Sequence, residues 1–197
     1  MVDLNGWKVI LGSGSPRRRE LMESLDIDFM VDTDTDFKES FNVHHPDGFV
    51  PERMSEGKSH GFHRPLADDE ILITADTMVF CGDEMMGKPR DRKDAVRMLR
   101  DLSGREHQVI TAVTIRTATR EKSFSDLTRV WFKELSDSEI NYYINNYKPF
   151  DKAGAYGCQE WIGAVGISRI EGSFYNVVGF PVHRVWEELM EFIKPDH

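Results

Sequence analysis

The sequence predicts an α/β fold in which helices flank a mixed, twisted β-sheet. Short apolar runs that are typical of strands alternate with runs of helical period, which favours a sheet with parallel strands. Two long β-rich stretches in the middle of the chain predict a hairpin, which adds an antiparallel pair. The length of 197 residues suits one sizeable core, so we expect a single domain over residues 1–197.

The N-terminal part is expected to form a strand, a tight turn and a helix. An apolar run over 7–11 leads into a turn of glycines and serines, and Pro16 suits the first position of a helix over 16–25. Residues 32–51 are polar and lack a sustained period, which indicates a loop. A second helix is expected over 51–63.

The apolar run at 71–75 predicts a buried central strand. Asp76 follows it directly, and the C-terminal end of a strand is where catalytic groups of α/β sheets often lie. A helix that Asp91 can cap comes next, with apolar residues at helical spacing and with Gly104 where a C-terminal glycine belongs.

The C-terminal part is expected to contain a hairpin, two helices and a strand. The stretches 107–118 and 122–133 are the expected arms of the hairpin. Residues 136–139 are Ser-Asp-Ser-Glu, the pattern of a capping box that opens a helix. A strand near 162–170 and an amphipathic helix over 181–193 complete the predicted order.

Composition and charge exclude several classes of protein. Apolar residues make up 40% of the chain, and no segment approaches the ~20 apolar residues of a membrane span, so no membrane partner is expected. The N-terminus lacks the pattern of a secretory leader, so the expected location is the cytoplasm. A net charge of −9 argues against nucleic acid as a partner, because such binding depends on clustered basic residues. The two cysteines are too few for a disulfide framework and form no structural zinc motif.

The turn at 12–19, Gly-Ser-Gly-Ser-Pro-Arg-Arg-Arg, has the features of a phosphate cradle. The amides and dipole of a helix N-terminus attract anions, glycines permit close approach, and arginines add forked donors. The spacing differs from that of a Walker A loop. An ordinary strand–helix turn with a solvated basic first turn is the alternative, although basic charge there is unfavourable to the helix itself and so favours a bound anion.

Two further positions carry charge that suits phosphate chemistry. Asp76 could hold a divalent metal or take a proton from water, and Lys88, in a Gly-Lys-Pro turn, could neutralise phosphate oxygens. The alternatives are that Asp76 caps a turn and that Lys88 is solvated.

The stretch 151–160 contains two glycines, an aromatic residue and an amide, without a helical or strand period. Such a loop can approach a ligand closely, and Gln159 can contact a base edge as both donor and acceptor. Cys158 is interpreted as a packing residue, because no residue near it in the sequence would activate it as a nucleophile. The histidines lack the spacing of a metal site, so we interpret them as surface or structural residues.

Taken in order, these pieces resemble the motifs of the Maf family. Its members carry an ASxSPRR turn, a DE[ST] element, an LAxxKA helix, an ADTVV segment with GKP after it, an LSGxxHxVxT segment and a DKAGAYGIQ loop. The corresponding stretches here span almost the whole chain and are 12–18, 38–40, 54–59, 75–79 with 87–89, 102–111 and 151–159.

The resemblance implies an α/β fold of two lobes around a cleft, similar to that of inosine triphosphate pyrophosphatases. It also implies attack by water at the α-phosphorus of a nucleoside triphosphate, with pyrophosphate leaving, and a divalent metal cofactor, Mg²⁺ or Mn²⁺. Asp76 would be the proton acceptor, and Glu39 would help it with the metal or the water. The residues that would bind the polyphosphate are Ser13, Arg17, Arg18, Lys58 and Lys88.

Base preference in the family is tuned at three positions, which are Arg17, Thr77 and Gln159 here. This combination looks like that of the group acting on dTTP and UTP. The chain also departs from the family pattern, since Lys38 replaces an acid of DE[ST] and Glu160 stands where many members have glycine. Four changes in the LAxxKA helix bear on the alignment of Lys58, namely Met54, Ser55, Gly57 and Ser59.

The resemblance favours an enzyme that hydrolyses dTTP or UTP and clears modified pyrimidines from the nucleotide pool. Two alternatives stay open, a nucleotide-binding regulator of septum formation without turnover and a Maf enzyme that prefers 7-methyl-GTP. The presence of Asp76, Lys88 and Arg17 argues against binding without turnover, since each group needed for turnover remains. The resemblance also makes a homodimer an expectation.

Overall fold

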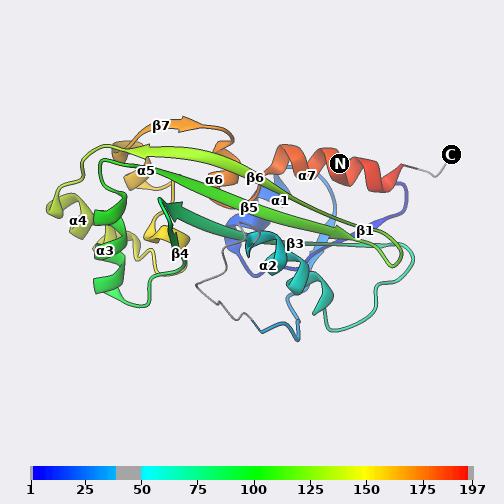
Figure 1. Ribbon diagram of the computed structural model, residues 1–197. Coiled ribbons are helices and arrows are strands. Elements are labelled where there is room, and N and C mark those ends of the chain that lie inside the picture. The colour runs from blue at the N-terminus through cyan, green and yellow to red at the C-terminus, as the bar shows by residue number, and fades with distance from the viewer. Residues whose placement is uncertain (1, 39–49, 195–197) are drawn as a thin grey trace. The chain divides into compact units, whose positions relative to one another are not determined.

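The computed structural model describes residues 2–38 and 50–194, and its strands form one mixed sheet in the order β2-β1-β3-β5-β6-β7, with β4 paired to β3 (Figure 1). The strands are β1 (Lys8–Leu11), β2 (Phe29–Val31), β3 (Glu70–Cys81), β4 (Glu84–Met86), β5 (Glu106–Arg116), β6 (Glu121–Phe132) and β7 (Ile167–Glu171). The helices are α1 (Pro16–Glu23), α2 (Val50–His60), α3 (Arg92–Leu102), α4 (Asp137–Tyr147), the 3-10 turn η1 (Ala153–Ala155), α5 (Trp161–Gly166), α6 (Phe174–Val178) and α7 (Val182–Ile193). The predicted α/β class with a mixed sheet is confirmed.

Parallel and antiparallel pairs share this sheet. β1 pairs in parallel with both β2 and β3, whereas β4 returns antiparallel onto β3 and β7 pairs antiparallel with β6. β5 and β6 are neighbours joined by a tight turn, in which the Thr117 amide donates to the Arg120 carbonyl at 2.8 Å. The predicted hairpin is therefore present.

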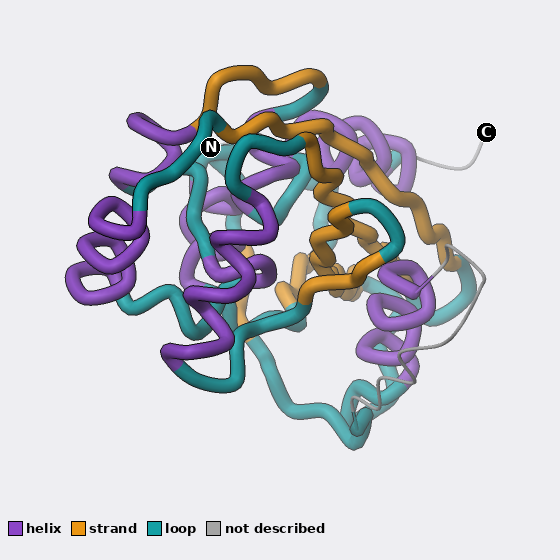
Figure 2. The backbone as a smooth tube through the Cα atoms, turned by 60° about the vertical axis from the view of Figure 1, so that its left-hand side comes forward, coloured by secondary structure: helices purple, strands orange, loops and turns teal. Residues whose placement is uncertain are grey.

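Helices, strands and loops alternate along the chain, as the backbone tube shows (Figure 2). By its internal contacts the chain divides into two compact units, each built from both helices and strands. Unit 1 consists of Met1–Asp76, Thr111–Ser125 and Gly179–His197, and unit 2 of Thr77–Ile110 and Asp126–Val178. β3 passes from unit 1 to unit 2 directly after Asp76. The residues that the sequence singles out are thus distributed over two cores.

The core of unit 1 is built on β1, the first half of β3 and α7. Val9 of β1 and Ile71 of β3 lie opposite each other in the parallel register, and both are buried. α7 begins after Pro181, where the amphipathic pattern predicts it. Its buried residues recur at helical spacing and are Val182, Val185, Leu189, Phe192 and Ile193.

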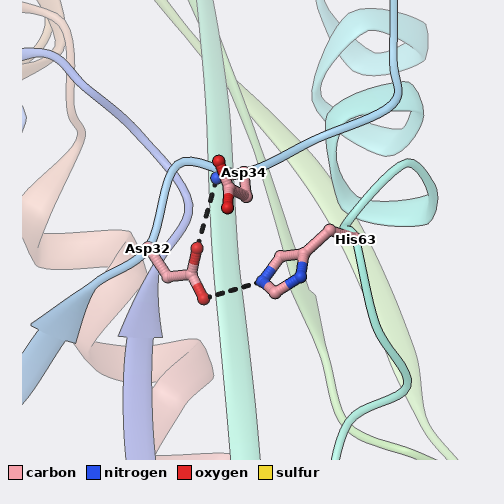
Figure 3. Close-up of side chains that lie close together, drawn as sticks. All are labelled: Asp32, Asp34 and His63. Atoms are coloured by element: carbon pink, nitrogen blue, oxygen red, sulfur yellow. Dashed lines mark hydrogen bonds and ion pairs between the residues drawn. The ribbon is translucent and has the colours of Figure 1, made fainter.

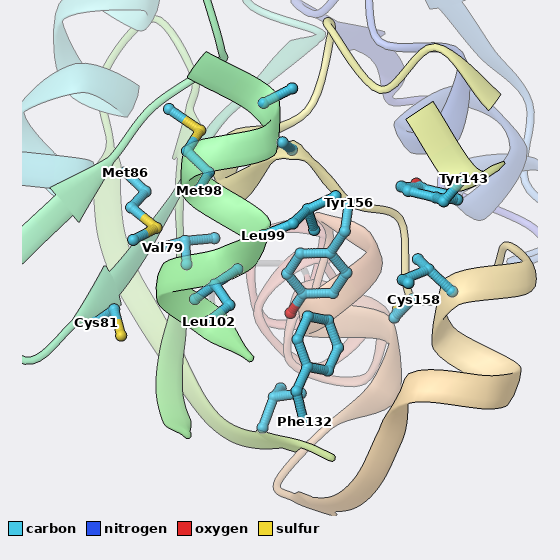
Figure 4. Close-up of a cluster of buried hydrophobic side chains, with 14 of the residues drawn as sticks. Val79, Cys81, Met86, Met98, Leu99, Leu102, Phe132, Tyr143, Tyr156 and Cys158 are labelled. Carbon is cyan, nitrogen blue, oxygen red and sulfur yellow. The ribbon is translucent and has the colours of Figure 1, made fainter. Parts of the chain in front are cut away.

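The core of unit 2 forms around α3. The Asp91 side chain caps this helix, because its Oδ1 accepts from the Asp94 amide at 2.7 Å. The buried face of α3 packs with strand residues and with the loop 151–160, as Figure 4 shows for Met98, Leu99, Leu102, Val79, Tyr156 and Cys158. α4 begins with the predicted capping box, in which Ser136 and Glu139 each accept from the other's backbone amide.

The strand that carries Asp76 is longer than predicted. β3 continues to Cys81, so Asp76 lies inside the strand and not at its end. The continuation is stabilised by β4, which pairs with β3 from Val79 to Cys81. The prediction of a strand that ends before Asp76 was wrong, because a partner strand of three residues leaves no periodic signal in the sequence.

A second correction concerns residues 161–166. They form the short helix α5 where a strand near 162–170 was expected, and β7 begins only at Ile167. Gly163 explains the tight packing of this turn, since a Cβ there would lie 1.8 Å from the Cys158 carbonyl oxygen. Contact with the preceding loop thus overrides the local β preference of this segment.

The length and composition of a helix decide whether it can cross a membrane. Within residues 2–38 and 50–194, none combines the length and the apolar character that crossing a bilayer requires.

Candidate active site

The start of α1 has the form that the glycine-rich turn predicts. Ser15 caps the helix through its side chain, Pro16 occupies the first turn, and that turn contains no acidic residue. Arg17 lies in the same turn and is half-buried. Amide groups and a guanidinium therefore share one helix N-terminus, which suits an anionic ligand.

The Arg18 side chain holds this turn in place. Its Nη1 donates to Ser13 Oγ at 3.2 Å and to the Ala75 carbonyl at 2.9 Å, and its Nε donates to the Gly179 carbonyl at 2.9 Å. Arg18 thus ties the turn after β1 to β3, at the residue that precedes Asp76. These hydrogen bonds hold the guanidinium, and its positive charge, at the start of α1.

Asp76 forms a close ion pair with Lys58 of α2. Nζ of Lys58 lies 2.6 Å from Oδ1 of Asp76, and the two side chains are 19% and 11% exposed. A charged pair this far out of solvent interacts more strongly than one at the surface. Lys58 donates to Oδ1, and a carboxylate has lone pairs on both of its oxygens.

Two serines fix α2 against the sheet and so align Lys58. Ser55 Oγ lies 2.9 Å from Thr114 Oγ1 of β5, and Ser59 Oγ accepts from Arg116 Nε of the same strand at 2.9 Å. Both serines are fully buried. These two departures from the LAxxKA pattern therefore add contacts to the sheet and leave Lys58 facing β3.

Gly57, a further departure, makes room for an aromatic ring. A Cβ at this position would lie 2.2 Å from Cε2 of Phe37. Gly57 therefore lets the segment that follows β2 pack closely over α2, one residue before Lys58. The glycine weakens the helix by its backbone entropy, and the close packing offsets that cost.

Lys88 and Gln159, two of the predicted ligand-binding residues of unit 2, are both exposed. The Gly154 amide donates to the Gly87 carbonyl at 3.1 Å. Gly154 has a φ of +69°, a backbone conformation that favours glycine. This bond ties the turn that carries Lys88 to the loop that carries Gln159.

The predicted site residues are thus divided between the units. Unit 1 brings together the turn after β1 and the Asp76 pair, that is Ser13, Arg17, Arg18, Lys58 and Asp76. Thr77, Lys88 and Gln159 belong to unit 2, and Thr77 follows Asp76 directly in β3. Glu39 lies outside the described residues.

Asp32, Asp34 and His63 form a cluster that the sequence reasoning missed (Figure 3). Asp32 Oδ2 lies 3.0 Å from His63 Nε2, and Asp32 Oδ1 accepts from the Asp34 amide at 3.2 Å. The hydrogen bond from His63 is the main cause that lowers the pKa of the Asp32 carboxyl below its ordinary value. Ligand atoms from all three residues lie within 4.8 Å of one another, so this donor set could hold a divalent cation. No spacing rule finds it, because His63 comes 31 positions after Asp32.

The start of α1 bears arginines and is tied to a strand with a buried carboxylate, and this arrangement suits an anionic ligand. The chain belongs to the Maf family, whose profile, described as Maf-like protein, matches residues 8–192. The resemblance drawn from the sequence motifs is thereby confirmed.

Curated relatives cover nearly the whole chain, and three of them bear the name dTTP/UTP pyrophosphatase. The protein from Parabacteroides distasonis is 47% identical, over 96% of this chain and 98% of its own length. The relatives from Bacteroides thetaiotaomicron and Porphyromonas gingivalis are 45% and 46% identical, over 95% and 96% of this chain and 97% and 96% of their own lengths. A solved nucleoside-triphosphatase / dITP/XTP pyrophosphatase from Mycobacterium abscessus aligns over 94% of this chain and 96% of that chain, with a TM-score of 0.44 and 11% identity.

Proposed function

We propose that this chain hydrolyses the pyrimidine nucleotides dTTP and UTP to the nucleoside monophosphate and pyrophosphate. The observation that carries the proposal is the buried pair of Asp76 and Lys58, which adjoins the turn held by Arg18. A pyrophosphatase needs a base for water and cations for the polyphosphate, and unit 1 has side chains that suit both roles. The relatives named dTTP/UTP pyrophosphatase, at 47%, 45% and 46% identity, support the choice of reaction and substrate.

In the proposed reaction Asp76 is the proton acceptor. The oxygen of a water molecule bonds to the α-phosphorus while the bond from that phosphorus to the pyrophosphate oxygen breaks, and Asp76 takes the proton that the water loses. Lys58 orients the carboxylate through its contact with Oδ1. Its positive charge also stabilises the negative charge that develops on the phosphate oxygens.

The turn after β1 is the proposed polyphosphate site. Ser13 and Arg18 are already bonded to each other at 3.2 Å, so ordering them costs little on binding. Arg17 adds a second guanidinium at the start of α1. Lys88 of unit 2 is the proposed additional cation for the phosphate oxygens.

A divalent cation, Mg²⁺ or Mn²⁺, is the proposed cofactor, with Asp76 and Glu39 as its ligands. Carboxylate oxygens are the ligands that such cations prefer, and a carboxylate that accepts from Lys58 at Oδ1 has a second oxygen that can serve as a ligand. When bound, the cation would neutralise charge on the reacting phosphate.

Arg17, Thr77 and Gln159 are the proposed determinants of pyrimidine preference. Gln159 is exposed, and its side-chain amide offers a donor and an acceptor that match the edge of thymine or uracil. This assignment rests on the Maf resemblance and on the names of the relatives.

Pyrophosphate release tests the proposal directly. Purified protein with Mg²⁺ or Mn²⁺ is expected to release pyrophosphate from dTTP and UTP in preference to dCTP, purine nucleotides and 7-methyl-GTP. Asp76→Asn should lower kcat by about 10³-fold, because it removes the base and keeps the size of the side chain. Asp69→Asn, which removes an exposed carboxylate paired with Lys8, should keep full activity.

The outcomes separate the parts of the proposal. Folded wild-type protein that binds dTTP without releasing pyrophosphate would refute the hydrolase and favour the regulator. Turnover confined to purine nucleotides would refute only the choice of substrate.

A homodimer located in the cytoplasm completes the proposal. Light scattering on the purified protein should give a mass near twice the 22.7 kDa of one chain. A mass that corresponds to one chain would contradict the dimer and leave the reaction unaffected.

A further inference from the structure

Three side chains of unit 2 form a chain of polar contacts across the loop 151–160. We call them the loop clamp, and they are Tyr143, Lys152 and Glu160. Oε1 of Glu160 lies 3.2 Å from Nζ of Lys152, and Oε2 accepts a hydrogen bond from the Tyr143 hydroxyl. Both carboxylate oxygens of Glu160 therefore bind partners, one at the start of the loop and one on α4.

The side chains of Tyr143 and Lys152 are buried, which limits the partners that each can reach. The Tyr143 side chain is fully buried, and Lys152 is 9% exposed. A buried ammonium group is costly unless it is paired, and the other carboxylate within reach of Lys152, that of Asp151, is itself 56% exposed. Burial is the main cause that raises the pKa of Tyr143 well above its ordinary value, and the hydrogen bond to Glu160 is the next. The hydroxyl therefore keeps its proton and donates it in the hydrogen bond to Glu160.

The backbone around Glu160 is shaped to admit the clamp. Glu160 stands at the N-cap position of α5, yet its side chain makes no capping bond there. At Gly157 a Cβ would lie 3.0 Å from Cδ of Glu160 and 3.1 Å from Cε of Lys152, so the absence of a side chain leaves space for both. Helix capping therefore does not explain where the Glu160 carboxylate lies, whereas the clamp does.

The clamp holds both ends of the short turn that presents Gln159. The Glu160 amide donates to the Gly157 carbonyl at 3.0 Å, which closes a turn over 157–160. The Tyr143 hydroxyl accepts from the Gly157 amide at 2.9 Å and donates to Glu160, so one phenol oxygen binds the first and the last residue of this turn. Gln159 lies inside the turn and is exposed.

We propose that Glu160 is a positioning residue that sets the nucleobase preference of this chain, because the clamp fixes the direction from which Gln159 presents its amide. The proposal rests on the proposed function, in which Gln159 contacts the base. Thymine and uracil present an acceptor at position 4, whereas cytosine presents a donor, and an amide can match either by turning over. The clamp holds the backbone from which Gln159 extends, and within the same turn the Cys158 thiol donates to Gln159 Oε1 at 3.8 Å, which favours one orientation of the amide. Loss of the clamp should therefore lower discrimination more than turnover.

Kinetics of clamp variants test this role. Glu160→Ala is expected to raise KM for dTTP and UTP by about tenfold and to lower the preference for dTTP over dCTP by a similar factor, with kcat changed by less than about threefold. Glu160→Gln can still accept from Tyr143 but cannot pair with Lys152, so its effects should be intermediate. The matched control is Glu171→Ala, which removes an exposed carboxylate on β7 of the same unit and should change neither parameter.

Hydrogen exchange of the same variants keeps the test independent of turnover. The Gly157 amide should exchange at least about tenfold faster in Glu160→Ala than in the wild type, with exchange in β1 and β3 unchanged. If the wild type releases no pyrophosphate, the proposed function fails, and binding of a non-hydrolysable dTTP analogue replaces KM as the measure of preference. Unchanged exchange at Gly157 would overturn the clamp, and faster exchange with unchanged dTTP/dCTP preference would overturn its role in base selection.

Discussion

Two lysine–carboxylate pairs, one in each unit, use the same chemical groups for different purposes. Lys58 lies 2.6 Å from Asp76 in unit 1, and Lys152 lies 3.2 Å from Glu160 in unit 2, with all four side chains no more than 20% exposed. Lys58 engages one oxygen of Asp76, whereas Lys152 and Tyr143 engage both oxygens of Glu160. Burial and charge are similar in both pairs, so under the proposed function the two carboxylates differ in how many of their oxygens the described contacts occupy.

The largest expected effect comes from replacing Lys58, the lysine of the pair in unit 1. Lys58→Met should lower pyrophosphate release by about 10²-fold or more, because it deletes the charge next to Asp76. It should also lower the free energy of unfolding by about 3 kcal/mol, since it leaves a buried carboxylate without its partner. Kinetics and urea unfolding measure the two effects.

A second substitution separates these effects. Asp76→Asn combined with Lys58→Met should recover much of the lost stability, because neither charge is then buried alone, while activity stays absent. Wild-type activity in Lys58→Met would contradict the role given to this pair.

A titration of His107 tests a buried base whose ring nitrogen contacts a tyrosine hydroxyl. His107 is buried beside Phe132, with Nε2 2.6 Å from the Tyr156 hydroxyl, and burial lowers its pKa to about 3. In the unfolded chain the pKa is about 6.5, so between these values the unfolded state binds a proton that the folded state does not. This contribution is therefore fully present above about pH 6.5 and falls as the pH drops toward 3, by up to about 1.4 kcal/mol per pH unit.

His107→Gln provides the comparison for that titration, because glutamine can keep a hydrogen bond to Tyr156 and does not titrate. Urea unfolding at several pH values should show a smaller loss of stability between pH 6.5 and 3 in this variant than in the wild type. Parallel curves for the two proteins would show that His107 does not contribute to the acid sensitivity.

The smallest expected effect concerns the helix that carries Lys58. Gly57→Ala places a Cβ 2.2 Å from the Phe37 ring, and such overpacking costs about 1–3 kcal/mol. The gain in helix propensity returns about 1 kcal/mol, so the net loss on urea unfolding should be small. Gly87→Ala is the control, because a Cβ there meets no atom within 4 Å. A Gly57→Ala variant that is more stable than the wild type by about 1 kcal/mol, the full gain in helix propensity, would show that Phe37 moves aside without cost.

Local signals in the sequence predicted most of the helices correctly. The capping serine and glutamate of α4, the capping aspartate of α3 and the apolar face of α7 each act within a few residues, so one sequence is enough to recognise them. The strand through Asp76 and the helix at 161–166 were predicted wrongly. Their conformations depend on β4 and on the packing of Gly163, which are contacts between segments.

The candidate site was likewise predictable from the sequence only in part. Motif order was enough to single out Asp76, Lys58 and the turn with Arg18, and the structure adds how serines of α2 align Lys58. The clamp could not be predicted, because Tyr143 stands on α4 outside the motif of the loop. Glu160 was visible only as a departure from the family pattern, without its partners.

The burial of Cys158 makes the loop clamp observable without any substitution. Both cysteines of the sequence, Cys81 and Cys158, are buried in unit 2 and neither forms a disulfide. A thiol reagent can reach such a group only when the surrounding structure opens. The rate at which Cys158 becomes alkylated therefore measures how often the loop 151–160 opens. Slower alkylation in the presence of dTTP would show that the nucleotide keeps this loop closed.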